Sequence, residues 1–210
     1  MKRLYGNLKM SWPTVILFAV ATGIYTGLIM LVDVLQETSF QDIGISFEWW
    51  VIFAVIIVVN CDKSWEAMLK CFVFFLISQP LVYAVEVLCG HLTFYMAEYY
   101  YRTIWFPRTL LTLPGGFIAY FCKKQNPLGA VILGIGNTLQ AVLAIHYISE
   151  ACISFPRHIL SGIVCIVSVF VMSFQIQKKK MCRMISILIP AVAVAVLLIL
   201  SVMGRLPVTI

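Results

Sequence analysis

The feature that most constrains this chain is an alternation of long, uninterrupted apolar runs with short polar or basic breaks. Inside a lipid bilayer every backbone N–H and C=O must be paired within its own segment or around a closed barrel. Barrel strands would show segments of about ten residues with alternating polarity, whereas these runs are continuous. The pattern therefore predicts an all-α, polytopic transmembrane helix bundle that forms a single domain over residues 1–210.

Hydropathy and turn residues predict about seven membrane helices, with six as the lower number. Their expected ranges are 14–35, 46–60, 67–90, 103–122, 127–149, 159–175 and 184–203. The composition agrees, because 62% of the 210 residues are hydrophobic, 11% are charged and the mean hydropathy is +0.99. A soluble domain carries roughly 25% charged residues. The first run exceeds the apolar core of about 7–15 residues found in signal peptides, so we expect a retained helix.

Basic residues are distributed unevenly between the two ends of the predicted helices. The N-terminal side holds 11 of the 15 Lys and Arg residues, namely Lys2, Arg3, Lys9, Lys63, Lys70, Lys123, Lys124, Lys178, Lys179, Lys180 and Arg183. By the positive-inside rule this side is cytoplasmic, so the N-terminus is expected inside the plasma (inner) membrane. These loop lysines also account for the net charge of +6, and no basic stripe remains that would bind a nucleic acid.

Several polar residues gather near the predicted outer ends of the third to fifth helices. Glu86 is an intramembrane carboxyl, and Arg102 and Arg108 lie at an aromatic-rich edge. Such ionisable groups are costly in lipid and often mark ligand pathways. Because arginine pairs well with carboxylate or phosphate, we expect an outward-facing pocket that binds or transports a small polar or anionic solute. The expected ligand-binding residues are Glu86, Arg102, Arg108, Tyr83, Trp105, Asn137, Gln140 and His146, with further walls from Tyr99 to Tyr101 and Tyr147.

The same residues also allow purely structural roles. Glu86 and Arg108 could form an internal ion pair, and Asn137 and Gln140 could join neighbouring helices by hydrogen bonds. In that case the protein is a scaffold or accessory subunit that binds a partner membrane protein. Its partner helices would pack on small residues of the first helix, such as Gly23.

An outer-face enzyme is the third possibility and the least favoured. Cys89 would be the nucleophile, His91 or His146 the base, and an arginine the oxyanion stabiliser, but such a site is defined by geometry. The seven cysteines form no CxxC pair or Cys/His cluster, so neither a metal nor a cofactor is expected. Cys89 and Cys152 both fall near the outer face and could form a disulfide.

Three segments carry a resemblance to known membrane proteins. Residues 46–50 (Ser-Phe-Glu-Trp-Trp), 72–83 and 105–120 resemble segments of small multi-pass membrane proteins of low-GC Gram-positive bacteria that carry no assigned function. This resemblance implies a bacterial plasma membrane. The chain length, helix number and small-residue first helix are also similar to the substrate-capture subunits of energy-coupling-factor vitamin transporters. That likeness implies a small-molecule ligand and a partner membrane subunit.

Overall fold

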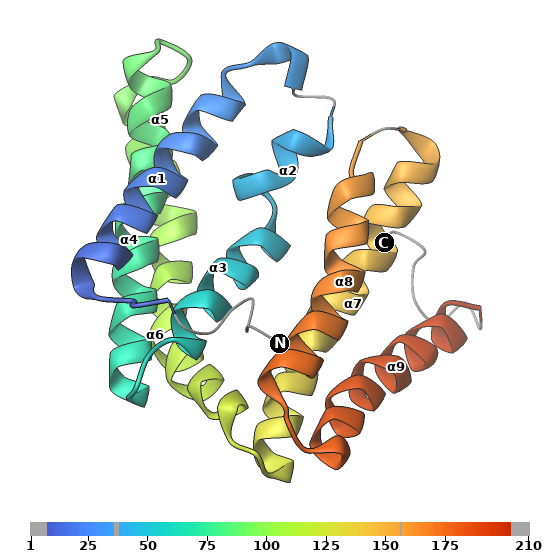
Figure 1. The fold of residues 1–210 in the computed structure, drawn as a ribbon. Helices are drawn as coiled ribbons and strands as arrows, with labels where there is room; N and C mark the ends of the chain where they lie inside the picture. The colour runs from blue at the N-terminus through green and yellow to red at the C-terminus, as the bar shows by residue number, and fades with distance from the viewer. Residues whose placement is uncertain (1–7, 36–37, 156, 203–210) are drawn as a thin grey trace. The chain divides into compact units, whose positions relative to one another are not determined.

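The computed structural model describes residues 8–35, 38–155 and 157–202, and every element in these ranges is a helix (Figure 1). The predicted all-α class is confirmed. Five helices are long and apolar enough to cross a membrane, which indicates a membrane protein. They are α1 (Trp12–Met30), α4 (Ser64–Leu88), α7 (Pro127–Ile153), α8 (Ile159–Ile176) and the Lys180–Leu200 part of α9 (Lys180–Val202). Lys2, Arg3, Arg205 and residue 203 lie outside the described residues.

Two of the seven predicted spans differ from their expected form. The span at 46–60 is α3 (Phe47–Val59), whose 13 residues reach about 20 Å, less than the bilayer core of about 30 Å. The span at 103–122 corresponds to α6 (Phe106–Tyr120). It continues without a break from α5 (Phe94–Tyr100) through a π-helical turn, η2 (Tyr101–Trp105), so most of the expected external connection is also helical. The 3₁₀ turn η3 (Phe121–Lys123) follows α6.

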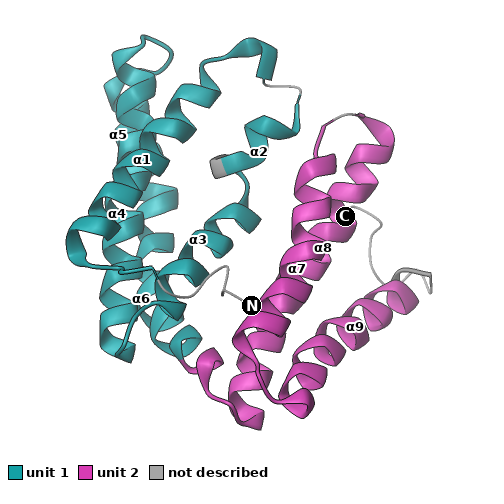
Figure 2. Ribbon diagram, viewed as in Figure 1, with its two compact units in different colours: residues 1–120 teal, residues 121–210 magenta. Residues whose placement is uncertain are grey.

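The chain divides into two compact units, Met1–Tyr120 and Phe121–Ile210 (Figure 2). The sequence shows neither a linker nor a change in composition at this boundary. Unit 1 also contains the short elements η1 (Asp33–Leu35) and α2 (Ser39–Ile45). Each unit has its own buried residues, so each is described separately below.

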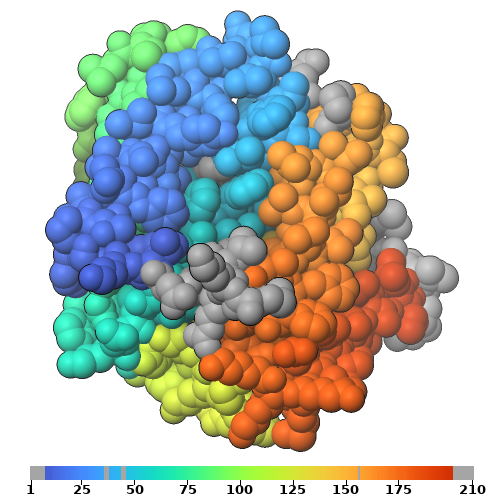
Figure 3. Space-filling view, in the orientation of Figure 1, coloured from blue at the N-terminus to red at the C-terminus, as the bar shows by residue number. Residues whose placement is uncertain are grey.

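Helix α4 is the centre of unit 1, because it packs against α1, α3, α5 and α6. The approach of α1 is close: a Cβ added at Gly23 would lie 2.7 Å from the carbonyl oxygen of Ser78, and one at Gly27 would lie 2.7 Å from Cβ of Val85. The small-residue stripe predicted to admit a neighbouring helix therefore does so, and that neighbour is α4 of the same chain. The outer side of α1 carries exposed apolar side chains and is seen in blue in Figure 3.

An aromatic core joins α1, α3 and α4. The rings of Phe18 and Phe74 lie 4.9 Å apart, and the rings of Trp50 and Phe75 lie 5.5 Å apart. Trp50 is only 4% exposed. Its burial brings α3 against α4 and fixes one wall of the pocket described below.

Four helix ends meet at one end of unit 1. The backbone N–H of Leu8, just before α1, donates to the side-chain oxygen of Asn60 at the end of α3, at 3.1 Å. The hydroxyl of Tyr120, the last residue of α6, donates to the carbonyl of Asp62 just before α4. These are the ends that the charge pattern assigned to one side of the membrane.

Unit 2 consists of α7, which packs against both α8 and α9. The side-chain amide of Asn137 on α7 donates to Ser173 Oγ of α8 at 2.8 Å and to the carbonyl of Ser186 of α9 at 3.1 Å. Only 11% of the α9 span is buried. This agrees with a peripheral, lipid-facing position, since residues 184–200 carry no side chain more polar than serine.

Two glutamines fasten the basic turns of unit 2. The buried amide of Gln177 donates to the carbonyl of Cys122 at 2.6 Å, and Gln125 Oε1 accepts the backbone N–H of Lys178 at 2.6 Å. The turn before α7 and the turn before α9 are thus tied together. Their lysines consequently lie at one end of this unit.

Candidate functional site

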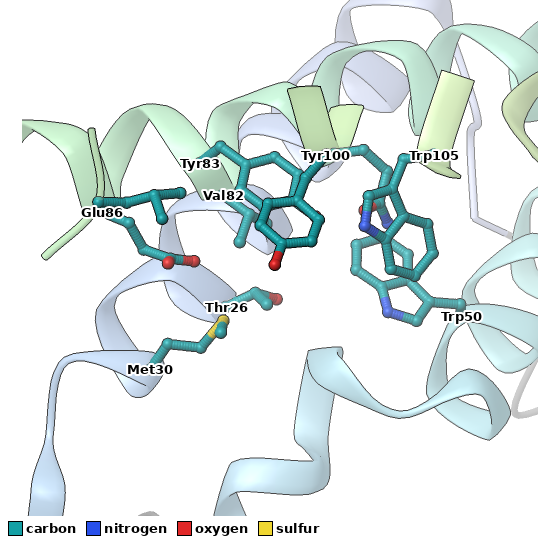
Figure 4. A pocket seen from close by; sticks show the side chains of 10 residues that line it. Thr26, Met30, Trp50, Val82, Tyr83, Glu86, Tyr100 and Trp105 are labelled. Carbon is teal, nitrogen blue, oxygen red and sulfur yellow. The ribbon is translucent and has the colours of Figure 1, made fainter. Parts of the chain in front are cut away.

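A cavity of about 260 Å³ lies in unit 1, toward the end away from the Leu8–Asn60 contact. Its walls come from α1, α3, α4, the connection after α4, α5 and η2. The lining residues are Thr26, Met30, Trp50, Gln79, Val82, Tyr83, Glu86, Leu92, Tyr100 and Trp105. Figure 4 shows the Glu86 carboxylate at one end of the cavity and the indoles of Trp50 and Trp105 at the other, with the tyrosine rings between them.

Helical spacing places the α4 contribution on one face. Gln79, Val82, Tyr83 and Glu86 stand at i, i+3, i+4 and i+7, so successive turns of α4 direct them to the same side. The stripe of Gln79, Tyr83 and Glu86 is visible in the sequence as a polar line in an apolar helix. The structure shows that this line faces the cavity.

The π-helical turn η2 shapes the opposite wall. Pro107 has no N–H, and in a regular α-helix its ring would clash with the carbonyl of Thr103. The turn before it is correspondingly wide, and the N–H of Phe106 donates to the carbonyl of Tyr101, five residues earlier. Tyr100 and Trp105 flank this turn and both line the cavity. Single π-helical turns inside α-helices occur frequently at functional sites.

Glu86 is the chemically most unusual group in the cavity. Its side chain is 9% exposed, and within the described ranges its Oε1 accepts no hydrogen bond. Burying a carboxyl oxygen without a partner is costly, and most buried polar atoms in native proteins have a partner. An unpartnered carboxyl that faces a cavity is therefore a candidate for ligand binding.

The aromatic side chains that line the cavity pack against one another. The rings of Tyr83 and Tyr100 are stacked, with centroids 6.4 Å apart and planes 9° apart. Three predicted site residues, Glu86, Tyr83 and Trp105, thus line one cavity, as does Tyr100 from the predicted aromatic wall. Thr26 and Trp50 were missed as site residues, because only the packing of α1 and α3 onto α4 brings them there.

The two arginines do not line this cavity. Arg102 is exposed and forms a salt bridge with Glu98 at 3.2 Å. Arg108 is exposed too, and its guanidinium lies 5.1 Å from the ring centroid of Trp105. Among the residues that the structure describes, no salt bridge joins Arg108 to Glu86, so neither the arginine clamp nor the internal ion pair expected from the sequence is present.

The other predicted site residues, Asn137, Gln140 and His146, belong to unit 2 and are not among the cavity's lining residues. Asn137 and Gln140 are fully buried, and the hydrogen bonds of Asn137 join α7 to α8 and α9 within unit 2. The ring of His146 lies 5.4 Å from that of Tyr147.

Of the residues in the enzymatic alternative, Cys89 and His91 are exposed and His146 is half-buried. Cys89 is a free thiol at the end of α4, and His91 follows it in the next turn. Cys152 in unit 2 is also a free, exposed thiol. Across the described residues, no group of three or more His, Cys, Asp or Glu side chains is placed to hold a metal ion.

Comparisons with family models, with curated proteins and with solved structures gave no match. The functional argument accordingly rests on the geometry of the cavity and on the chemistry of its lining.

Proposed function

We propose that this chain is a small multi-pass protein of a bacterial plasma membrane that binds or transports a small polar solute in the unit 1 cavity. One observation carries the proposal: Glu86 faces an aromatic-walled cavity, and its buried Oε1 accepts no hydrogen bond from the described residues. Ionisable groups inside membrane-spanning segments commonly mark ligand or ion pathways.

The character of the cavity supports this function. Small-molecule sites are mostly apolar and aromatic, with a few polar groups that orient the ligand. Here four aromatic residues and Glu86, Gln79 and Thr26 meet that description. The volume of about 260 Å³ suits a small solute.

The proposed topology has a cytoplasmic N-terminus and a cavity that opens to the external side. The charge pattern supports it, since Lys9, Lys63 and Lys70 lie near the helix ends opposite the cavity. The five long helices cross the membrane in this proposal. In the proposed topology α3 and the α5–η2–α6 stretch each cross the membrane once, which gives seven crossings in total.

The scaffold alternative is less well supported. Its predicted contact surfaces were the small-residue stripe of α1 and the amide stripe of α7. Gly23 packs against α4, and Asn137 is bonded to α8 and α9, so both stripes are used inside their own units. Solute binding is therefore the function that the described packing favours.

A cavity-filling variant tests the proposal. Three probes of similar shape and different charge are titrated into the purified protein in a non-ionic detergent: benzylammonium, phenylacetate and benzyl alcohol. Binding is followed by the fluorescence of Trp50 and Trp105 and by the thermal unfolding midpoint. At least one probe should bind saturably to the wild type, and Val82→Phe should abolish that binding because the new ring occupies the cavity.

The matched control is Ala84→Phe, which adds a ring at an exposed position of the same helix and should leave binding intact. If Val82→Phe does not fold, Met30→Trp fills the same cavity from α1. Absence of saturable binding by all three probes, or equal binding by the wild type and both filled variants, would contradict the proposed function.

A further inference from the structure

The charge of the solute follows from the cavity's own electrostatics. Glu86 is the single ionisable carboxyl or basic side chain among the ten residues that line the described cavity. The remaining polar groups are hydroxyl, amide and indole groups, which carry no charge. A negatively charged solute would therefore find no compensating cation in the lining.

Among the described residues, no neighbouring basic group forms a salt bridge with Glu86. The imidazole of His91 interacts with the carboxylate electrostatically but is not paired with it. The guanidinium of Arg102 is paired with Glu98, and that of Arg108 lies against the indole of Trp105. In the ranges that the structure covers, no lysine or arginine lies within salt-bridge distance of Glu86. The carboxyl is consequently available to a positive group that enters the cavity.

The aromatic side chains that line the cavity also favour a positively charged solute. The face of an aromatic ring is electrically negative, so it attracts cations, and tryptophan and tyrosine are the strongest ring partners. In Figure 4 the rings of Tyr83 and Tyr100 lie between Glu86 and the indoles of Trp50 and Trp105, so aromatic faces line the cavity along its length. Aromatic walls with an adjacent carboxyl are suited to ammonium groups, which need both a counter-charge and shielding from water.

We infer that the solute is a small organic monocation whose ammonium or amidinium group pairs with Glu86 while its apolar part packs between Trp50 and Trp105. This inference rests on the proposed function and specifies its ligand class. It replaces the anionic solute expected from the arginines, because those arginines lie outside the cavity lining.

The test compares the same three probes quantitatively. Benzylammonium should bind the wild type at least about tenfold more tightly than benzyl alcohol, which corresponds to one charge-assisted contact. Glu86→Gln, which keeps the shape of the side chain, should reduce benzylammonium affinity to about that of benzyl alcohol and leave benzyl alcohol affinity unchanged. Glu98→Gln, which neutralises an exposed carboxylate outside the lining, should change neither affinity.

Two results would overturn the inference: tighter binding of phenylacetate than of benzylammonium, or a benzylammonium preference that survives Glu86→Gln. In either case the proposed function still holds if the probes bind and Val82→Phe abolishes that binding. If no probe binds at all, both the proposed function and this inference are contradicted. If Glu86→Gln does not fold, Tyr83→Leu takes its place. Loss of the ring face nearest Glu86 should lower benzylammonium affinity severalfold and leave phenylacetate affinity unchanged, and equal losses would contradict the inference.

Discussion

Gly23 has no Cβ, and this allows α1 to pack closely against α4. An added Cβ would lie 2.7 Å from a backbone oxygen of Ser78, and backbone cannot move aside as a flexible side chain can. The close approach also holds Thr26 of α1 beside Gln79 of α4 in the cavity wall. Gly23 therefore contributes both to the packing of unit 1 and to the geometry of the site.

Gly23→Ala should lower the free energy of unfolding of the protein by about 1–3 kcal/mol, the usual cost of overpacking. The control is Gly115→Ala on α6, where an added Cβ meets nothing within 4 Å. Alanine is the better helix former by about 1 kcal/mol, so this control should be neutral or stabilising. Thermal unfolding in detergent measures both variants, and equal midpoints would show that the α1–α4 approach is looser than described.

For individual residues, the sequence predicted part of the site correctly. Glu86 and Tyr83 could be found because they share one face of one helix, and helical periodicity is visible in a single sequence. Trp50 and Thr26 could not, because they reach the cavity only when separate helices pack together. The arginines were expected to converge because of their charge, but an exposed arginine finds local partners, here Glu98 for Arg102.

Among the elements, the stretch from α5 to α6 departs most from its prediction. The predicted span of 103–122 contains Pro107, and a proline inside a helix ordinarily kinks or ends it. Instead the helix accommodates Pro107 by widening to a π-helical turn. The sequence predicts that a helix is distorted at a proline. It does not show whether the helix ends there or continues through a turn that contains one extra residue.

Deletion of Thr103 should convert η2 to regular α-helix. In a regular α-helix the ring of Pro107 would clash with the carbonyl four residues before it, which costs about 3 kcal/mol or more. The thermal midpoint should therefore fall, and probe binding should fall strongly because Tyr100 and Trp105, at the two ends of the turn, are displaced from the cavity wall. The control Thr103→Ala removes only the hydroxyl bond to the carbonyl of Tyr99 and should preserve binding. Full binding by the deletion variant would mean that the π turn does not position the cavity wall.

For the whole molecule, the sequence predicted helical class and membrane character well, since both follow from long apolar runs. It did not predict the division into two units, because the boundary at Tyr120 and Phe121 carries no change in composition. It did predict a rather short helix at 46–60, which is α3. The run at 46–60 is apolar throughout, and its length as a helix is set by turns at Ser46 and Asn60.

The proposed topology makes a prediction about thiol labelling. Cys89 and Cys152 are exposed, while the other five cysteines are buried. Cys89 ends α4 at the cavity end of unit 1, and Cys152 lies at the end of α7 opposite the lysine-rich turns of unit 2. Both should therefore lie outside if those lysines are cytoplasmic. A membrane-impermeant maleimide added to right-side-out vesicles should label both thiols, as measured by mass spectrometry.

Single Cys89→Ser and Cys152→Ser variants assign each label, and the double variant should remain unlabelled because buried thiols react poorly. Labelling that requires a reductant first would instead indicate that the two cysteines form a disulfide in the membrane. Labelling of both only in inverted vesicles would reverse the proposed orientation and place the cavity on the cytoplasmic side. In the proposed topology the chain crosses the membrane an even number of times between Cys89 and Cys152, so both thiols lie on the same side. Labelling of one thiol from each side would require an odd number of crossings and would contradict this topology.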